Sequence, residues 1–287
     1  MSLMTLTEAE ILTLLKNLHN FSPEEQEEIE QIADELTKRK HAASCRNDLI
    51  EFCKHMQPDY KVGKHHRILA DLLMKTALGL EDRVCVNIPP RHGKSHLVSI
   101  YFPAWFLGKF PDKKILIVSH TTDRAVDFGR KVRNLIASDA YKEIFPTVDL
   151  AADSKSAGRW NTNSGGEYFA CGVGSALAGR GADLFIIDDP HSEQEAKQGR
   201  ADVFEPAWEW FQSGPVQRLM PGGAIIVVMT RWSKQDLTGR IVDHMTREED
   251  AEEWEVVEFP AILNEKPLWP EFWSIEELLA KKASMDV

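Results

Sequence analysis

Cysteine is scarce in this 287-residue sequence, and its spacing excludes two common kinds of site. The four cysteines, Cys45, Cys53, Cys85 and Cys171, are too few and too scattered for a disulfide framework, and no two form a C-x-x-C pair. The histidines form no H-E-x-x-H pattern or other metal-ligand spacing. We therefore expect reduced thiols and no structural transition-metal site, and any metal should arrive with a substrate.

Long apolar runs are also lacking. No stretch approaches the ~20 residues that a membrane helix needs, and the N-terminus lacks the basic start and apolar core of a secretory signal. The composition, with 43% hydrophobic and 28% charged residues, is typical of a globular protein and excludes a collagen-like or largely disordered chain. We expect an intracellular protein that is not secreted and has no membrane partner.

Acidic residues outnumber basic ones, 45 to 34, so the formal net charge is −11. Residues 1–40 carry nine acids and four bases and residues 246–287 carry twelve and four, so the ends contribute −5 and −8 and the middle +2. No long basic stripe is present. Small basic clusters at Arg124–Arg133 and Arg231–Arg240 still leave room for a local anionic ligand.

From residue 83 onward, short apolar runs alternate with helical periods, which predicts βα units around a mostly parallel sheet. Several runs are continuously apolar, so helices should cover both faces of that sheet. Thr7 with Glu10, and Ser22 before Pro23, predict two helix starts near the N-terminus, and a last helix is expected from Ser274. The expected strands are 84–88, 115–118, 168–173, 184–187, 224–229 and 254–259, and the expected helices are 94–107, 121–138, 193–219 and 233–246.

A strand, a proline-bounded loop and a helix that begins at a lysine follow one another in residues 84–95, as in a phosphate-binding loop. In such a loop, backbone N–H groups surround the phosphates, Lys94 adds a positive charge and the Ser95 hydroxyl holds Mg²⁺. The usual first glycine of the motif would fall at Ile88, and Gly-Lys-Ser occurs by chance in roughly one chain in ten. The predicted nucleotide contacts are Pro90, Arg91, His92, Gly93, Lys94, Ser95 and His96.

Two adjacent carboxylates, Asp188 and Asp189, end the apolar strand 184–187. A carboxylate at the C-terminal edge of such a strand can hold Mg²⁺, and the next acid can polarise an attacking water, so Asp188 and Asp189 receive these roles. Glu193 and Glu195 are alternatives for the second role. In isolation, Asp-Asp-Pro is equally consistent with an ordinary strand-ending turn.

Two further side chains have open interpretations. Thr230 follows the apolar strand 224–229 and either senses the γ-phosphate or satisfies a strand-end backbone group. Arg180, in Gly179-Arg180-Gly181, is either a solvated surface charge or an arginine finger that enters a neighbouring subunit's site.

Together these segments resemble the ATPase (motor) domain of the large terminase subunit of tailed double-stranded DNA bacteriophages. The resemblance implies an α/β P-loop NTPase of the additional-strand (ASCE/RecA-like) type, with a mostly parallel central sheet flanked by helices and an N-terminal helical subdomain. It also implies Mg²⁺-dependent ATP hydrolysis that moves viral DNA into a procapsid. The supporting segments are 89–95, 102–105, 128–130, 179–183, 187–190 and 230–232.

The same resemblance implies partners and residue roles. The chain would form a homo-oligomeric ring around double-stranded DNA when assembled on the portal, a pentamer being one candidate, and would be monomeric in isolation. Portal protein and small terminase subunit would be its partners, in the cytoplasm of the infected host. The implied roles are phosphate and Mg²⁺ binding by Lys94 and Ser95, metal binding by Asp188, catalysis by Asp189, coupling by Thr230, a trans-acting finger at Arg180 or Arg91, and an adenine contact by His66.

We expect three regions: a helical or lid region at 1–60, the ATPase core at 61–262, and an extension at 263–287 toward a nuclease domain that is absent, so that this chain should not cleave DNA. Two other functions stay open. One is a superfamily-2-like helicase motor, which needs a second RecA-like domain that the 57 residues after Thr230 do not hold. The other is a non-catalytic adaptor regulated by nucleotide.

Overall fold

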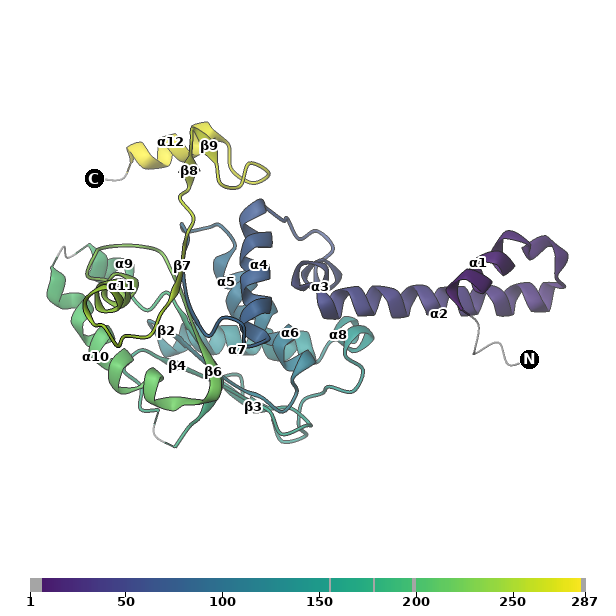
Figure 1. The fold of residues 1–287 in the computed structure, drawn as a ribbon, viewed down its shortest axis with the longest axis horizontal. Helices are drawn as coiled ribbons and strands as arrows, with labels where there is room; N and C mark the ends of the chain where they lie inside the picture. The colour runs from purple at the N-terminus through teal and green to yellow at the C-terminus, as the bar shows by residue number, and fades with distance from the viewer. Residues whose placement is uncertain (1–6, 155, 178, 198–199, 285–287) are drawn as a thin grey trace.

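A seven-stranded sheet forms the centre of the computed structural model, which describes residues 7–154, 156–177, 179–197 and 200–284 (Figure 1). All neighbouring strands are parallel except the first pair, which is antiparallel. In order across the sheet, the strands are β3 (Arg159–Asn161), β4 (Glu167–Gly172), β2 (Lys114–Ser119), β5 (Ala182–Asp188), β6 (Leu219–Met229), β1 (Arg83–Asn87) and β7 (Glu255–Glu258).

One strand separates the two motifs singled out in the sequence. β1 leads into the loop that ends at Lys94, β5 ends at Asp188, and β6 pairs with both strands and lies between them. This is the arrangement of an additional-strand P-loop fold, so the predicted α/β class and sheet type are confirmed. All six predicted strands are present.

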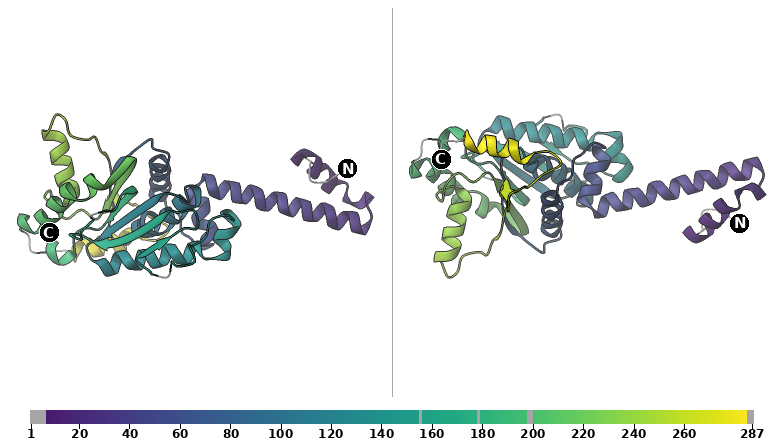
Figure 2. Two further views of the ribbon diagram at one scale, coloured as in Figure 1. Left: turned by 90° about the horizontal axis from the view of Figure 1, so that it is seen from below. Right: turned by 90° about the horizontal axis from the view of Figure 1, so that it is seen from above.

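Helices cover both faces of the sheet, as its continuously apolar strands predict (Figure 2). Along β1, Val84 and Val86 pack into one core, together with α4 (Lys64–Ala77), α6 (Phe102–Lys109) and α7 (Thr122–Ile136). Cys85 points the other way, into a second core with α10 (Glu205–Ser213) and α11 (Leu237–Arg247). This alternation follows from the two-residue period of a strand.

The N-terminal helices form an arm that projects from the body (Figures 1 and 2). It consists of α1 (Glu8–Lys16) and α2 (Pro23–Asn47), and capping boxes at Thr7 and Ser22 confirm both predicted helix starts. The arm is anchored to the body near the end of α2, where the Trp105 indole N–H donates to the Cys45 carbonyl at 3.0 Å. There it meets α3 (Leu49–Met56) and α8 (Asp139–Ile144).

The C-terminal segment lies beside the loop that leads from β1 to Lys94. It contains the hairpin of β8 (Ile262–Leu263) and β9 (Lys266–Pro267), followed by α12 (Ile275–Ala283), which Ser274 caps as predicted. The Trp273 indole N–H donates to the Arg91 carbonyl at 3.4 Å. This contact ties the segment to the loop.

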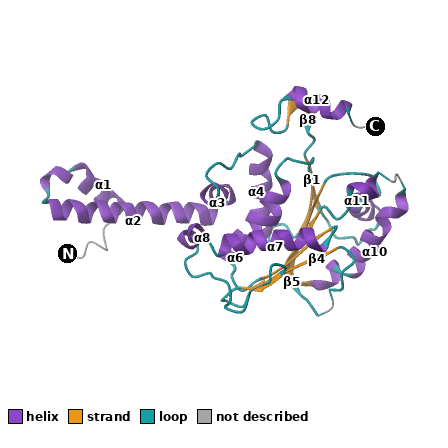
Figure 3. Cartoon of the chain, turned by 180° about the vertical axis from the view of Figure 1, so that it is seen from behind, coloured by secondary structure: helices purple, strands orange, loops and turns teal. Residues whose placement is uncertain are grey.

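The predicted helix 193–219 is broken into shorter pieces (Figure 3). α9 (Glu193–Ala196) is one turn, α10 begins with Pro206 in its first turn, and Gly214-Pro215 ends it. Proline lacks the N–H that a helix interior requires, so an uninterrupted helix cannot form there. Among the described residues, no helix combines the length and apolar character needed to cross a bilayer.

Candidate nucleotide-binding site

The loop after β1 is held in a conformation that requires glycine at its end. Gly93 has φ +80°, and a Cβ at this position would lie 2.2 Å from His66 Nε2. Both the backbone angle and the close approach therefore exclude larger residues. Lys94 follows as the first residue of α5 (Lys94–His96) and is buried.

A π-helical segment, Leu97–Tyr101, continues the helix after α5 and precedes α6. Such segments are rare and often occur at functional sites. Here Ser99, within the segment, and Ser95, one turn earlier, both donate hydrogen bonds to the Asp188 carboxylate. The helix after the loop therefore presents two hydroxyls to the end of β5.

Lys94 brings its ammonium group to the second carboxylate of the pair. Nζ lies 2.8 Å from Asp189 Oδ2 and 3.4 Å from the Thr230 hydroxyl oxygen. The three residues follow β1, β5 and β6, at the carboxyl edge of the sheet where ligands bind in open α/β folds. The structure thus brings together three of the residues singled out in the sequence.

Asp188 is fully buried, and its environment opposes its negative charge. Burial and the neighbouring Asp189 raise its pKa to about 6, although Lys94 and the hydroxyls of Ser99 and Ser95 act in the opposite direction. The Ser95 hydroxyl lies 3.0 Å from Asp188 Oδ1. A carboxylate and a hydroxyl are oxygen ligands that suit Mg²⁺, and a cation here would offset the buried charge. The residues present therefore fit the metal that the motif implies.

Asp189 occupies a left-handed backbone conformation, with φ +46°. Its own N–H donates to the Val228 carbonyl at 2.9 Å, and its Oδ1 accepts from the Thr230 N–H at 3.0 Å. Arg124 Nη2 lies 3.7 Å from Oδ2. A non-glycine residue at positive φ is uncommon and is held here by these contacts, which fix the carboxylate beside Lys94.

A cleft of about 630 Å³ opens in front of these groups. Glu193 lines it, but its carboxylate pairs with Lys197 Nζ at 2.7 Å, and the Glu195 carboxylate accepts from the Ser192 N–H at 2.7 Å. Both alternative acids are thus bound to other partners. The lining consists of Pro90, Arg91, Gly93, Lys94, Ser95, His96, His120, Arg124, Asp189, His191, Ser192, Glu193, Thr230 and Trp232.

His66 and His92 lie behind the loop and are not among the residues that line the cleft. His66 Nδ1 accepts from the Gly63 N–H at 3.0 Å, so its Nε2–H is free to donate to the His92 carbonyl, 3.1 Å away. Burial and the adjacent His65 lower the pKa of His66 to about 3, so its ring is neutral near pH 7. This placement differs from the adenine contact expected for His66, which instead supports the loop from behind.

Arg180 lies far from Lys94 in this chain. It precedes β5, whereas Asp188 ends β5, and a strand of this length spans on the order of 20 Å. The guanidinium pairs with Glu167 at 3.2 Å and stacks over the Phe169 ring. Arg180 is therefore neither a freely solvated charge nor part of its own chain's cleft. Arg91 is exposed at the edge of the cleft.

Several site residues escape the sequence analysis. Arg124 reaches Asp189, although the sequence showed it only as one of a basic cluster. Asp236 is buried and accepts hydrogen bonds from the Trp232 and Ser233 N–H groups, which shapes the turn after Thr230. Its position before the apolar helix α11 is a helix N-cap signal that could have identified it. His120, His191 and Ser99 carry no comparable signal.

No protein-family profile matches the chain, and no curated protein is a significant sequence match. Among the solved structures that match it are two phage proteins. The large terminase of bacteriophage HK97 is 14% identical with a TM-score of 0.48, over 76% of this chain and 43% of that one. A mutant of the Thermus phage P74-26 large terminase ATPase domain is 15% identical with a TM-score of 0.47, over 79% and 90%. This chain thus spans less than half the length of the HK97 protein.

Proposed function

We propose that this chain binds and hydrolyses ATP in a Mg²⁺-dependent manner. The observation that carries the proposal is the meeting of Lys94 and Ser95, on the loop after β1, with Asp188 and Asp189 at the end of β5. The topology supports the same conclusion, because β6 separates the two strands as in additional-strand P-loop ATPases. The cleft in front is polar and bordered by the cationic groups of Lys94 and Arg124.

Each residue of this group has a task that suits its chemistry. Lys94 would turn from Asp189 to a phosphate oxygen, and the backbone N–H groups near Gly93 would bind further oxygens. Ser95 and Asp188 would hold Mg²⁺, which when bound neutralises developing phosphate charge. Asp189, released from Lys94, would orient the attacking water and accept its proton. Its short side chain and fixed backbone keep the carboxylate at the cleft wall.

We further propose that hydrolysis drives movement of double-stranded DNA, as in a phage packaging motor. The motif order resembles that of large terminases, and Thr230 links the loop to β6 through its contacts with Lys94 and the Ile88 carbonyl. Portal protein and small terminase subunit are the proposed partners, in the cytoplasm of an infected bacterium. Arg180 would act on a neighbouring copy in a ring, because it lies at the opposite edge of its own sheet.

Phosphate release from ATP by the purified chain, with Mg²⁺ and with or without duplex DNA, tests the proposal. We expect turnover that DNA stimulates, and a loss of about 10²–10³-fold in Lys94→Ala because a preorganised positive charge at the phosphates is removed. Asp189→Asn should lose about 10²–10⁴-fold in kcat.

Lys113→Ala is the matched control, since Lys113 also pairs with an aspartate, Asp183, at 2.8 Å but at the other edge of the sheet. It should keep wild-type turnover. Nucleotide binding without phosphate release, at every protein concentration and with DNA present, would instead favour the non-catalytic adaptor.

A further inference from the structure

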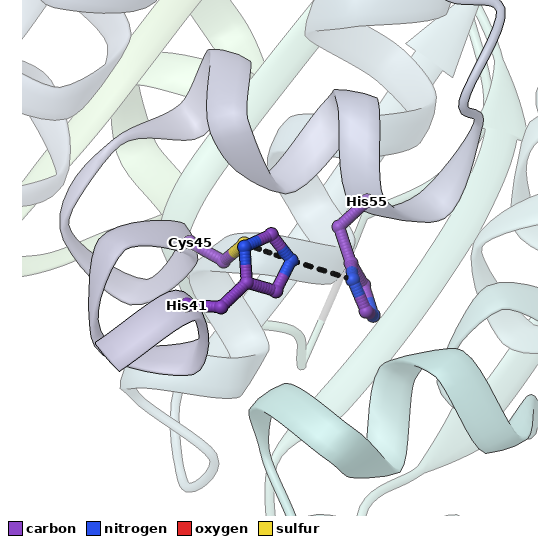
Figure 4. A group of neighbouring side chains, drawn as sticks. All are labelled: His41, Cys45 and His55. Carbon is purple, nitrogen blue, oxygen red and sulfur yellow. Dashed lines mark hydrogen bonds between the residues drawn. The ribbon is translucent and has the colours of Figure 1, made fainter. Parts of the chain in front are cut away.

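A cysteine and two histidines meet where the N-terminal arm joins the body. None of the three lines the cleft described above. His41 and Cys45 lie one turn apart on α2, and His55 comes from α3 (Figure 4). One ligand atom from each lies within 4.8 Å of the other two. The sequence predicts no transition-metal site, because the usual ligand spacings do not include two residues one turn apart on a helix together with a third residue from the next helix.

Two of the three distances within this group are close to those of a metal site. Tetrahedral Zn²⁺, with bonds of about 2.0–2.1 Å to nitrogen and 2.3 Å to sulfur, places its nitrogen and sulfur ligands about 3.6 Å apart and two nitrogens about 3.3 Å apart. Cys45 Sγ lies 3.6 Å from His41 Nε2, and His41 Nε2 lies 3.0 Å from His55 Nδ1. The third pair of ligand atoms, from Cys45 and His55, lies within 4.8 Å, so one ring would move closer to complete the site.

The second ring nitrogen of His55 orients the first. His55 Nε2 lies 2.8 Å from the Ala140 carbonyl oxygen on α8, which can only accept, so Nε2 carries the proton and Nδ1 presents a lone pair to the group. Metal-binding histidines commonly donate their other N–H to a carbonyl in this way. Glu143 Oε2, 3.5 Å from the same nitrogen, adds a negative charge nearby.

A cavity of about 480 Å³ adjoins His41, so a fourth position for water is accessible. Glu35 and Glu143 line it, together with the basic side chains of Lys38, Arg39 and Arg46. Arg39 pairs with Glu35 at 2.8 Å, and Arg46 donates to the Ile144 carbonyl at 2.8 Å. The guanidinium groups of Arg39 and Arg46 are thus bound to groups other than the two histidines and the cysteine.

We infer that His41, Cys45 and His55 bind a Zn²⁺ ion that joins the end of α2 to α3. One thiolate and two imidazoles form a mixed nitrogen–sulfur donor set that suits zinc rather than Mg²⁺ or Ca²⁺. Because the thiolate is the form of cysteine that binds metals, the ion would displace the thiol proton of Cys45 as it binds. The ion would brace the arm at its attachment to the body.

Titration of the untagged, chelator-treated chain with Co²⁺, a spectroscopic substitute for Zn²⁺, tests this inference. We expect one equivalent to produce a thiolate-to-metal charge-transfer band that Zn²⁺ abolishes by displacement. Cys45→Ser should lose the band. His41→Ala, a substitution at an exposed position, should bind Zn²⁺ at least about 10–100-fold more weakly, since removing an outer-shell partner alone costs that much.

Cys53→Ser provides the matched control, because Cys53 is a buried thiol on α3 outside the group. It should retain the band, as should Asp188→Asn, which separates this site from the nucleotide site. Absence of a charge-transfer band in the wild type, an unchanged Zn²⁺ affinity in a folded His41→Ala chain, or loss of the band in Cys53→Ser but not in Cys45→Ser would overturn the inference.

Discussion

Asp188 is a buried carboxylate whose negative charge a bound cation would stabilise. Its pKa of about 6, against an ordinary value of 3.8, means that ionising it in the folded chain costs free energy that the unfolded chain does not incur. A free-energy cost of this kind is typical of functional sites, whose residues make the folded protein less stable than other residues at the same positions would. The burial of Asp188 therefore explains both the free-energy cost of ionising it and its proposed role in binding a metal ion.

Replacing Asp188 by Asn should stabilise the nucleotide-free protein while abolishing Mg²⁺-dependent activity. Between pH 4 and pH 6 the folded wild type retains a proton that the unfolded chain has lost, so its stability falls as pH rises through this window and then stays constant. A shift of about two pKa units corresponds to about 2–3 kcal/mol, or a few °C in Tm. The advantage of Asp188→Asn should be full above pH 6 and vanish near pH 4, as thermal unfolding at several pH values would reveal.

Asp183→Asn is the comparison at the opposite end of the same strand. Its carboxylate accepts from Lys113 Nζ and the Lys114 N–H, both at 2.8 Å, so this substitution should lower Tm. A Tm for Asp188→Asn below that of the wild type at pH 7 to 8 would refute the account of buried charge.

At the scale of elements, the strands and capped helices are predictable because local patterns determine them. The six predicted strands are apolar runs, and Thr7, Ser22 and Ser274 are capping residues whose partners lie three positions away. β3 escapes prediction because it has only three residues and pairs at the sheet edge. The helix at 193–219 fails because its helical periodicity masks the breaks at Pro206 and Gly214-Pro215.

The site is predictable where a motif and a strand end coincide, as at Lys94, Ser95, Asp188 and Thr230. Contacts between distant segments are not. Arg124 reaches Asp189 only because β2 pairs with β5, and His66 supports the loop only because α4 packs behind it. Neither pairing leaves a trace in local spacing, so the sequence does not predict the contact of Arg124 with Asp189 or the packing of His66 behind the loop.

At the scale of the whole molecule, the position of Arg180 predicts that activity depends on assembly. If a neighbouring copy supplies this guanidinium, turnover per chain should rise with protein concentration, and Arg180→Ala should bind ATP normally while losing about 10³-fold or more in kcat. Steady-state turnover across a dilution series provides the measurement. Arg159→Ala is the control, because Arg159 also approaches Glu167, at 3.6 Å. A turnover per chain that does not change with protein concentration and is the same in Arg180→Ala would exclude the trans role.

The proposed function requires that Lys94 and Asp188 bind one Mg²⁺–nucleotide complex at the carboxyl edge of the sheet. Calorimetric titration of the full chain with a non-hydrolysable ATP analogue, with and without Mg²⁺, tests it most directly. We predict one site per chain, binding at least about tenfold weaker in Lys94→Ala, and a Mg²⁺ dependence that Asp188→Asn loses. Equal affinity in the wild type and Lys94→Ala, with Mg²⁺ dependence intact in Asp188→Asn, would contradict it.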